Sequence, residues 1–164
     1  MFYPGDLARF ALAEFERGIE GVSPEEALVR LKKADGSLMN AISWTIAHIS
    51  THWLTTLAYA KKEPSPPNWR RFVGREADPT PPPLDEAKQM LAVAKEAAEW
   101  WAGADGSALS YKRDDRPESA GTGLMRVILH TWFHMGEMNA IRQMLGHKEI
   151  PFVGQMAGRM EWRP

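Results

Sequence analysis

Four of the five histidines in this chain form two pairs whose members are four residues apart. His48 pairs with His52, and His130 pairs with His134. Residues four apart share one face of an α-helix and lie about 6 Å apart along its axis. Neutral imidazole is the commonest metal ligand among side chains. The spacing therefore points to a divalent metal ion, which would act as a Lewis acid on a bound water or thiol.

The neighbours of the second pair predict which way it points. With about 100° of rotation per residue, His134 falls in an apolar stripe and His130 lies at its edge. The stripe contains Val127, Thr131, His134, Met138, Ile141 and Leu145. Both histidines should therefore point into the protein, where an unpaired polar ring is costly.

The first pair lies on a face of a different kind. An aliphatic stripe of the same helix contains Ile42, Ile46, Ile49, Trp53 and Leu57. About a quarter-turn away lie aromatic and hydrogen-bonding side chains, namely Trp44, Thr45, His48, His52, Thr55 and Tyr59. This second face predicts the wall of a polar cavity. We interpret His48, His130 and His134 as ligands of one metal ion. The alternative is that they are ordinary hydrogen-bonded histidines of a helical core.

Two further residues are candidates for proton transfer or for orienting a ligand. Four roles are open for His52, namely a fourth metal ligand, a group that supports a ligand, a proton carrier and an ordinary hydrogen-bonded histidine. Glu137 follows His134 by one helical turn. It either accepts the second N–H of a ligand, as carboxylates around metal sites do, or is a solvated carboxylate. Gly136 either allows a neighbouring helix to approach closely or is a tolerated helical glycine.

These histidines require long helices to position them. Periodicity and capping patterns predict long helices over about 4–18, 38–62, 84–102 and 121–145. A shorter helix begins at Ser23 and ends at Asp35-Gly36. Seven of the twelve prolines lie between Pro64 and Pro83, so this segment must be a long loop. The sequence therefore predicts an all-α fold, a four-helix bundle with a short extra helix and a long Pro-rich crossover loop.

Composition limits the class of protein. The 164 residues, 44% of them hydrophobic, suit a single domain over 1–164. The net charge of -1 lacks the basic excess of a nucleic-acid binder. The absence of cysteine excludes disulfides, thiolate ligands and cysteine nucleophiles. No signal-peptide pattern and no apolar run of about 20 residues occurs, so we expect a cytoplasmic protein that does not enter the membrane.

Two segments resemble the motifs of DinB-like proteins. Ala41–Ile49 is similar to the segment that carries the first metal histidine of that family. His130–Arg142 is similar to its second motif, in which His-x-x-x-His is followed by a small residue and then by glutamine or glutamate. Leu145–His147 and Pro151–Gly154 resemble the family's closing segment. Order and spacing agree from about Leu38 to Met156.

The resemblance implies a bundle in which His48, His130 and His134 bind zinc, nickel or iron, and it implies a homodimer. Some relatives are transferases or isomerases in which a low-molecular-weight thiol meets the metal. The second histidine, His52, and the Pro-rich loop depart from the family pattern, and both bear on ligand number and substrate choice. We therefore expect a metal-dependent enzyme of thiol-dependent transferase or hydrolase type that acts on a small molecule. The alternative is a non-catalytic dimeric binding or stress-response module whose metal is structural or absent.

Overall fold

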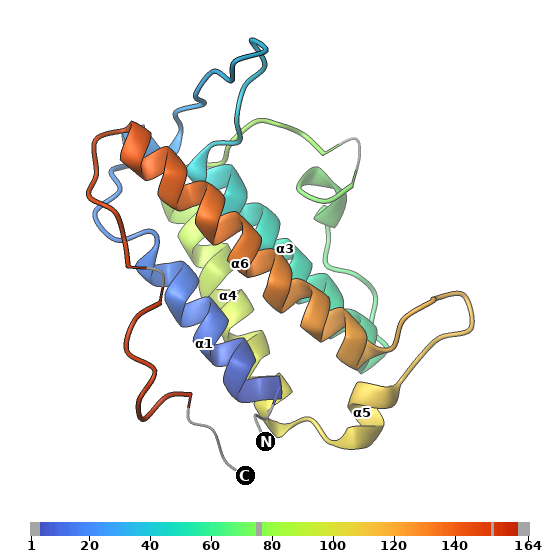
Figure 1. The fold of residues 1–164 in the computed structure, drawn as a ribbon. Coiled ribbons are helices and arrows are strands. Elements are labelled where there is room, and N and C mark those ends of the chain that lie inside the picture. Colours follow the sequence, from blue (N-terminus) through green and yellow to red (C-terminus); the bar gives the residue numbers. More distant parts are fainter. Residues whose placement is uncertain (1–3, 75–76, 152, 161–164) are drawn as a thin grey trace.

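Four long helices form the framework of the protein. A computed structural model describes residues 4–74, 77–151 and 153–160 (Figure 1). The long helices are α1 (Pro4–Arg17), α3 (Ile42–Lys61), α4 (Leu84–Gly103) and α6 (Ala120–Met144). The described residues contain no strand, only an isolated bridge between Lys32 and Leu38. The predicted all-α four-helix bundle is confirmed.

The packing order of the helices explains the long loop. Helices α1 and α3 each pack against both α4 and α6. Figure 1 shows that α3 and α4 run in the same direction, opposite to α1 and α6. Because two parallel neighbours cannot be joined by a tight turn, the chain returns along the bundle through residues 62–83. This crossover loop carries a 3₁₀ turn, η1 (Trp69–Arg71), and buries Phe72.

A buried polar contact joins α3 to α6 within the apolar core. The largest fully buried side chains are Trp53, Trp101, Phe15, Leu12, Ile42, Ile46, Ile49, Leu124, Ile128, Met138 and Ile141. The indole N–H of Trp53 donates to Thr131 Oγ1 at 3.0 Å. The Thr131 hydroxyl in turn donates to the Val127 carbonyl at 2.8 Å. Trp53 directly follows His52, and Thr131 directly follows His130. This contact therefore fixes the axial position of one histidine pair relative to the other.

The short predicted helix is much shorter than expected. Helix α2 (Pro24–Ala27) has the predicted capping box at Ser23 and Glu26, but it does not reach Asp35-Gly36. Instead, the chain turns back at Asp35, whose carboxylate accepts from the Ser37 amide at 2.9 Å. The Met39 amide then bonds to the Leu31 carbonyl at 2.8 Å. These contacts hold the segment extended, which is why α3 begins at Ile42 rather than near residue 38.

One small helix was not predicted. Helix α5 (Gly106–Ser110) lies in the polar stretch between α4 and α6. Asp105 caps it, because its carboxylate accepts from the Ala108 amide at 2.9 Å. The sequence predicted helices over about 84–102 and 121–145 and none between them.

A buried carboxylate fixes the segment 153–160 to α1. Glu14, only 1% exposed, accepts from the Gly154 amide at 2.8 Å and from Arg17 Nη2 at 2.6 Å. Arg159 approaches its other oxygen at 3.2 Å. Burial opposes ionisation, but the Gly154 amide and the two guanidiniums outweigh it and hold the pKa of Glu14 below its ordinary value. Phe152, part of the family-like closing segment, lies outside the described residues.

We predict that Gly5→Ala destabilises the bundle by about 1–3 kcal/mol, because an added methyl group overpacks a helix crossing. A Cβ at Gly5 would lie 2.1 Å from the Cα of Ala102 in α4. Thermal unfolding followed by circular dichroism measures the change. Gly136→Ala is the matched control, because a Cβ there meets nothing within 4 Å. The control should be neutral or stabilising by up to about 1 kcal/mol. Equal effects of the two substitutions would contradict the close crossing of α1 and α4.

Candidate metal centre

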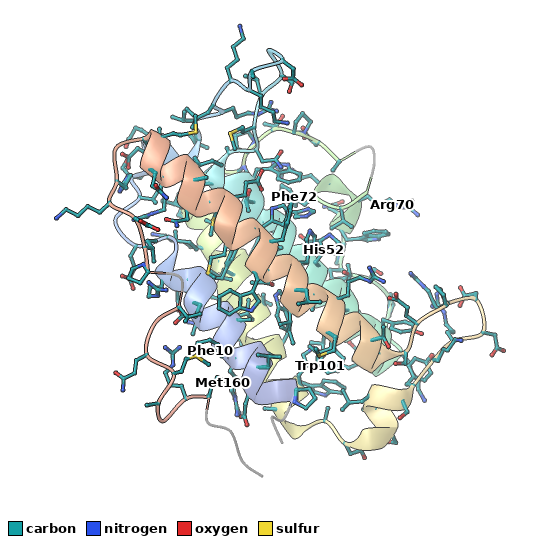
Figure 2. The ribbon with its side chains drawn as sticks, in the orientation of Figure 1. Phe10, His52, Arg70, Phe72, Trp101 and Met160 are labelled. Atoms are coloured by element: carbon teal, nitrogen blue, oxygen red, sulfur yellow. The ribbon has the colours of Figure 1, made fainter. Side chains whose placement is uncertain are left out.

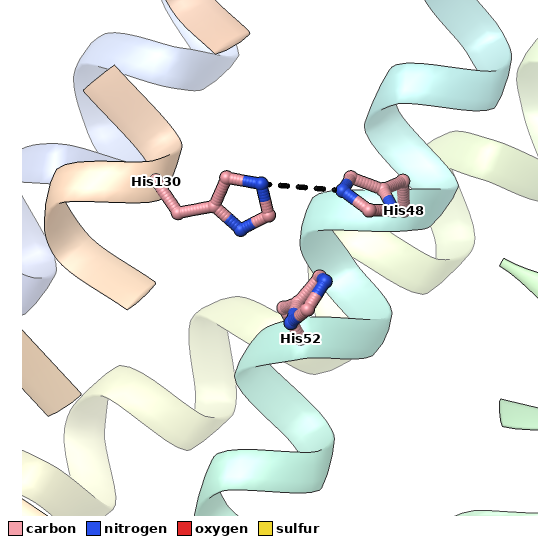
Figure 3. A group of neighbouring side chains, drawn as sticks. All are labelled: His48, His52 and His130. Atoms are coloured by element: carbon pink, nitrogen blue, oxygen red, sulfur yellow. Dashed lines mark hydrogen bonds between the residues drawn. The ribbon is translucent and has the colours of Figure 1, made fainter. Parts of the chain in front are cut away.

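Helices α3 and α6 bring the two histidine pairs together. Figure 3 shows His48 and His52 on α3 beside His130 on α6. His134 lies one turn further along α6. One ring nitrogen from each of His48, His52 and His130 lies within 4.8 Å of the others. This three-histidine group could hold a metal ion. His134 adjoins it, since its ring centroid lies 4.6 Å from that of His130 and 4.9 Å from that of His48.

The Nε2 atom of His130 is the meeting point of the cluster. It lies 3.3 Å from Nε2 of His48 and 3.0 Å from Nε2 of His134. Two histidine nitrogens bound to one tetrahedral zinc ion at about 2.05 Å lie about 3.3 Å apart. The two separations from His130 Nε2 are therefore close to the spacing of ligands that share one ion, whereas the group whose ligand atoms all lie within 4.8 Å of one another is His48, His52 and His130.

In His48 and His134, the second ring nitrogen, Nδ1, lies within hydrogen-bond distance of an oxygen acceptor. Nδ1 of His48 lies 2.5 Å from the carbonyl oxygen of Phe72 in the crossover loop. Nδ1 of His134 lies 2.7 Å from Oε2 of Glu137. A carbonyl or carboxylate oxygen only accepts, so each Nδ1 carries a proton, and in the neutral ring Nε2 then presents its lone pair to the centre. Metal-binding histidines are typically oriented in this way.

The proton count at the centre favours a cation. His48 and His134 each present a lone pair to His130 Nε2, which can donate at most one proton. At least one of the two close approaches therefore has no proton to bridge it. A divalent ion would satisfy all three nitrogens at once, and imidazole donors suit zinc, nickel and iron.

The surroundings keep these rings neutral. Burial, and to a smaller extent the neighbouring histidines, lowers the pKa of His52 to about 3. The same causes lower the pKa of His130 to about 4. Burial is also the main cause that lowers the pKa of His48. At neutral pH these three imidazoles are therefore unprotonated and able to bind a metal.

His52 differs from the other three histidines. Neither of its ring nitrogens hydrogen-bonds to a residue that the structure describes, although its ring packs edge-on against His48 and His130 at 4.6 Å. It also lines two cavities beside the cluster, of about 430 and 680 Å³. His130 borders the larger one. Of the predicted polar wall, His52, Thr55 and Tyr59 line the smaller cavity, whereas Trp44 and Thr45 are buried.

The crossover loop closes the cluster on the side of His48. The Trp44 ring stacks on His48 with centroids 4.8 Å apart, and its N–H donates to the Asp78 carbonyl at 2.6 Å. Figure 2 shows Phe72 and His52 on the side of the bundle that this loop covers. The role of the Phe72 carbonyl was missed, because a backbone acceptor carries no sequence signature. The aromatic residues of the loop were the only indication that it docks.

The structure places the two remaining candidate residues, Glu137 and Gly136. Glu137 is partly exposed and accepts a hydrogen bond from Nδ1 of His134. Gly136 does not permit a close helix approach, since space around it is open.

Comparisons with known protein families, with curated proteins and with solved structures found no match for this chain. Among the residues described, no helix is both long enough and apolar enough to cross a membrane.

We predict that the metal-free protein loses stability as the pH falls from about 6.5 toward 4. His52 and His130 have folded-state pKa values of about 3 and about 4, below the ordinary histidine value. In that range the unfolded chain binds protons that the folded chain does not, at a cost of up to about 1.4 kcal/mol per pH unit for each proton. Urea unfolding across the range measures the loss.

The matched control is His52→Gln/His130→Gln, which removes both titrating groups and keeps polar side chains. Carboxylates contribute equally in both proteins. The free energy of unfolding is plotted against pH for each protein, and the difference between the two slopes gives the contribution of the histidines. Identical slopes would contradict the lowered pKa values.

Proposed function

We propose that this protein is a metal-dependent enzyme of the DinB-like type, with His48, His130 and His134 as the ligands of a divalent ion. The observation that carries the proposal is that His130 Nε2 lies 3.3 Å from Nε2 of His48 and 3.0 Å from Nε2 of His134, with Nδ1 of both outer rings bonded to a fixed acceptor. An ordinary core histidine needs only one partner. Imidazole nitrogens this close together, on rings that are oriented by an acceptor at the other nitrogen, are typical of a metal site.

Each residue of the site has a distinct role in this proposal. A bound ion would supply Lewis acidity, which lowers the pKa of a bound water or thiol. Glu137 and the Phe72 carbonyl orient His134 and His48. His52 faces the cavities without a hydrogen-bond partner among the described residues, so it is the residue best placed to contact a substrate as a neutral hydrogen-bonding ring.

The cavities favour catalysis over a purely structural metal. A structural site is closed by four protein ligands, whereas a catalytic site leaves a position that solvent or substrate reaches. Here both His52 and His130 border open space. We propose a reaction of thiol-dependent transfer or hydrolysis on a small molecule. We also propose a homodimer, which the exposed Leu129 and Phe133 on α6 support.

Metal content measured by elemental mass spectrometry tests the proposal. We predict about one transition-metal ion per wild-type chain and none in a folded His130→Ala/His134→Ala variant, which removes two of the three ligands. His52→Ala should retain the ion, because His52 is not among the three ligands. Circular dichroism verifies that each variant is helical.

Equal metal content in wild type and in the double variant would overturn the site. Loss of the ion in His52→Ala would instead make His52 a ligand. That result would close the shell and favour the structural alternative, a non-catalytic binding or stress-response module.

A second prediction concerns the support of His134. Glu137→Gln should weaken metal affinity about tenfold to a hundredfold, because the amide holds the imidazole N–H less strongly than a carboxylate does. Competition with a chromogenic chelator measures the affinity. Glu96→Gln, which neutralises an exposed carboxylate on α4, should leave it unchanged. Equal affinities of wild type and Glu137→Gln would show that Glu137 does not support the site.

A further inference from the structure

The smaller cavity beside His52 has a basic end that the proposed metal chemistry does not explain. The cavity of about 430 Å³ is large enough for a small organic molecule. One wall is α3, from His52 to Tyr59, and the crossover loop supplies Trp69. The far wall is the segment before α6, which contributes Arg113 and Arg116.

Tyr59 holds that far wall in place. Its hydroxyl donates to the Glu118 carbonyl at 3.1 Å and accepts from the Arg113 amide at 3.0 Å. The Cζ atoms of Arg113 and Arg116 both lie 5.7 Å from the centre of the Tyr59 ring. The two guanidiniums are thus gathered around one aromatic ring at the end of the cavity.

The charged side chains that line the cavity form ion pairs with side chains of opposite charge, except Arg116. Arg113 forms an ion pair with Asp115 at 2.6 Å, Glu118 with Arg126 at 3.0 Å, and Glu63 with Lys61 at 3.0 Å. The Arg116 side chain forms no ion pair and no hydrogen bond within the described part of the chain, although it lies over the Tyr59 ring and interacts electrostatically with the Asp115 carboxylate. The start of α6, which is capped by Ser119 and also lines the cavity, adds positive potential.

We propose that this cavity binds a small organic carboxylate, with its carboxylate paired to Arg116 and its body extending toward His52. The inference rests on the proposed function, since it names the substrate class of the same site. Seven residues of helix separate His52 from Tyr59, which is about 10 Å. The ligand therefore carries its carboxylate about two helical turns from its reacting group. Trp69, Pro64 and Val73 provide a mostly apolar wall for the body between them.

Calorimetric titration with phenylbutyrate and with its uncharged analogue phenylbutyramide tests the assignment. The two probes share a body of suitable length and differ in charge. We expect wild-type protein to bind the carboxylate about tenfold more tightly than the amide, as a guanidinium–carboxylate pair allows. In Arg116→Gln the ratio of the two affinities should fall to about one, while the affinity for the amide stays the same.

Arg70→Gln is the matched control. Arg70 is also an exposed arginine that rests on an aromatic ring, with Cζ 5.3 Å from the centre of Trp69, but it does not line the cavity. Figure 2 shows it on the outer side of the crossover loop. This variant should keep the wild-type ratio. No binding of phenylbutyrate to wild type, an unchanged ratio in Arg116→Gln, or an equal fall in Arg70→Gln would overturn the proposal.

The metal content of the same samples separates this inference from the proposed function. All variants should contain equal metal, so a carboxylate bound directly to the ion would give the same ratio in each. A protein without metal that retains the Arg116-dependent ratio would remove the metalloenzyme proposal and leave the carboxylate site standing. A metal-containing protein whose affinity ratio does not depend on Arg116 would remove the carboxylate site and leave the metalloenzyme proposal standing.

Discussion

The hydrogen bond between Trp53 and Thr131 is the contact on which the centre depends. It joins α3 to α6 inside the core, one residue after His52 and one after His130. If one helix slipped along the other by one residue, the buried indole N–H of Trp53 would lose its acceptor, at a cost of about 1–3 kcal/mol. Such a slip would also turn the histidines by about 100° and separate their Nε2 atoms. The apolar core favours any close packing of the two helices, whereas this directional bond selects one register.

The parallel arrangement of α3 and α4 supplies the second requirement. Because these helices are neighbours, the connecting loop must run back along the bundle, and this path takes it past His48. The loop then contributes the Phe72 carbonyl that fixes the tautomer of His48. The burial of Phe72 and the bond from Trp44 to the Asp78 carbonyl hold the loop at this distance. The topology of the bundle therefore sets the protonation pattern of one histidine.

Features that repeat along one helix were predictable from the sequence, and features that depend on contacts between segments were not. The faces of α3 and α6 follow from helical periodicity, so the inward direction of His134 and the polar wall at Tyr59 were predicted. The backbone partner of His48 was not, because a carbonyl is common to every residue. The early end of α2 was also missed. The turn at Asp35 competes with helix there, and its amide-to-carboxylate bond satisfies backbone groups that a helix would otherwise pair.

Neutral, closely packed imidazoles carry a cost in the folded protein. The burial that lowers the pKa of His52 to about 3 and of His130 to about 4 makes protonation of these two rings unfavourable at neutral pH. The rings also cannot satisfy one another fully, because His130 Nε2 has at most one proton for its two close neighbours, Nε2 of His48 and Nε2 of His134. A core selected for stability alone would replace these rings with apolar side chains of similar size. These rings lie beside open cavities, and the Phe72 carbonyl and Glu137 hydrogen-bond to His48 and His134, so the arrangement is one that could hold a metal ion.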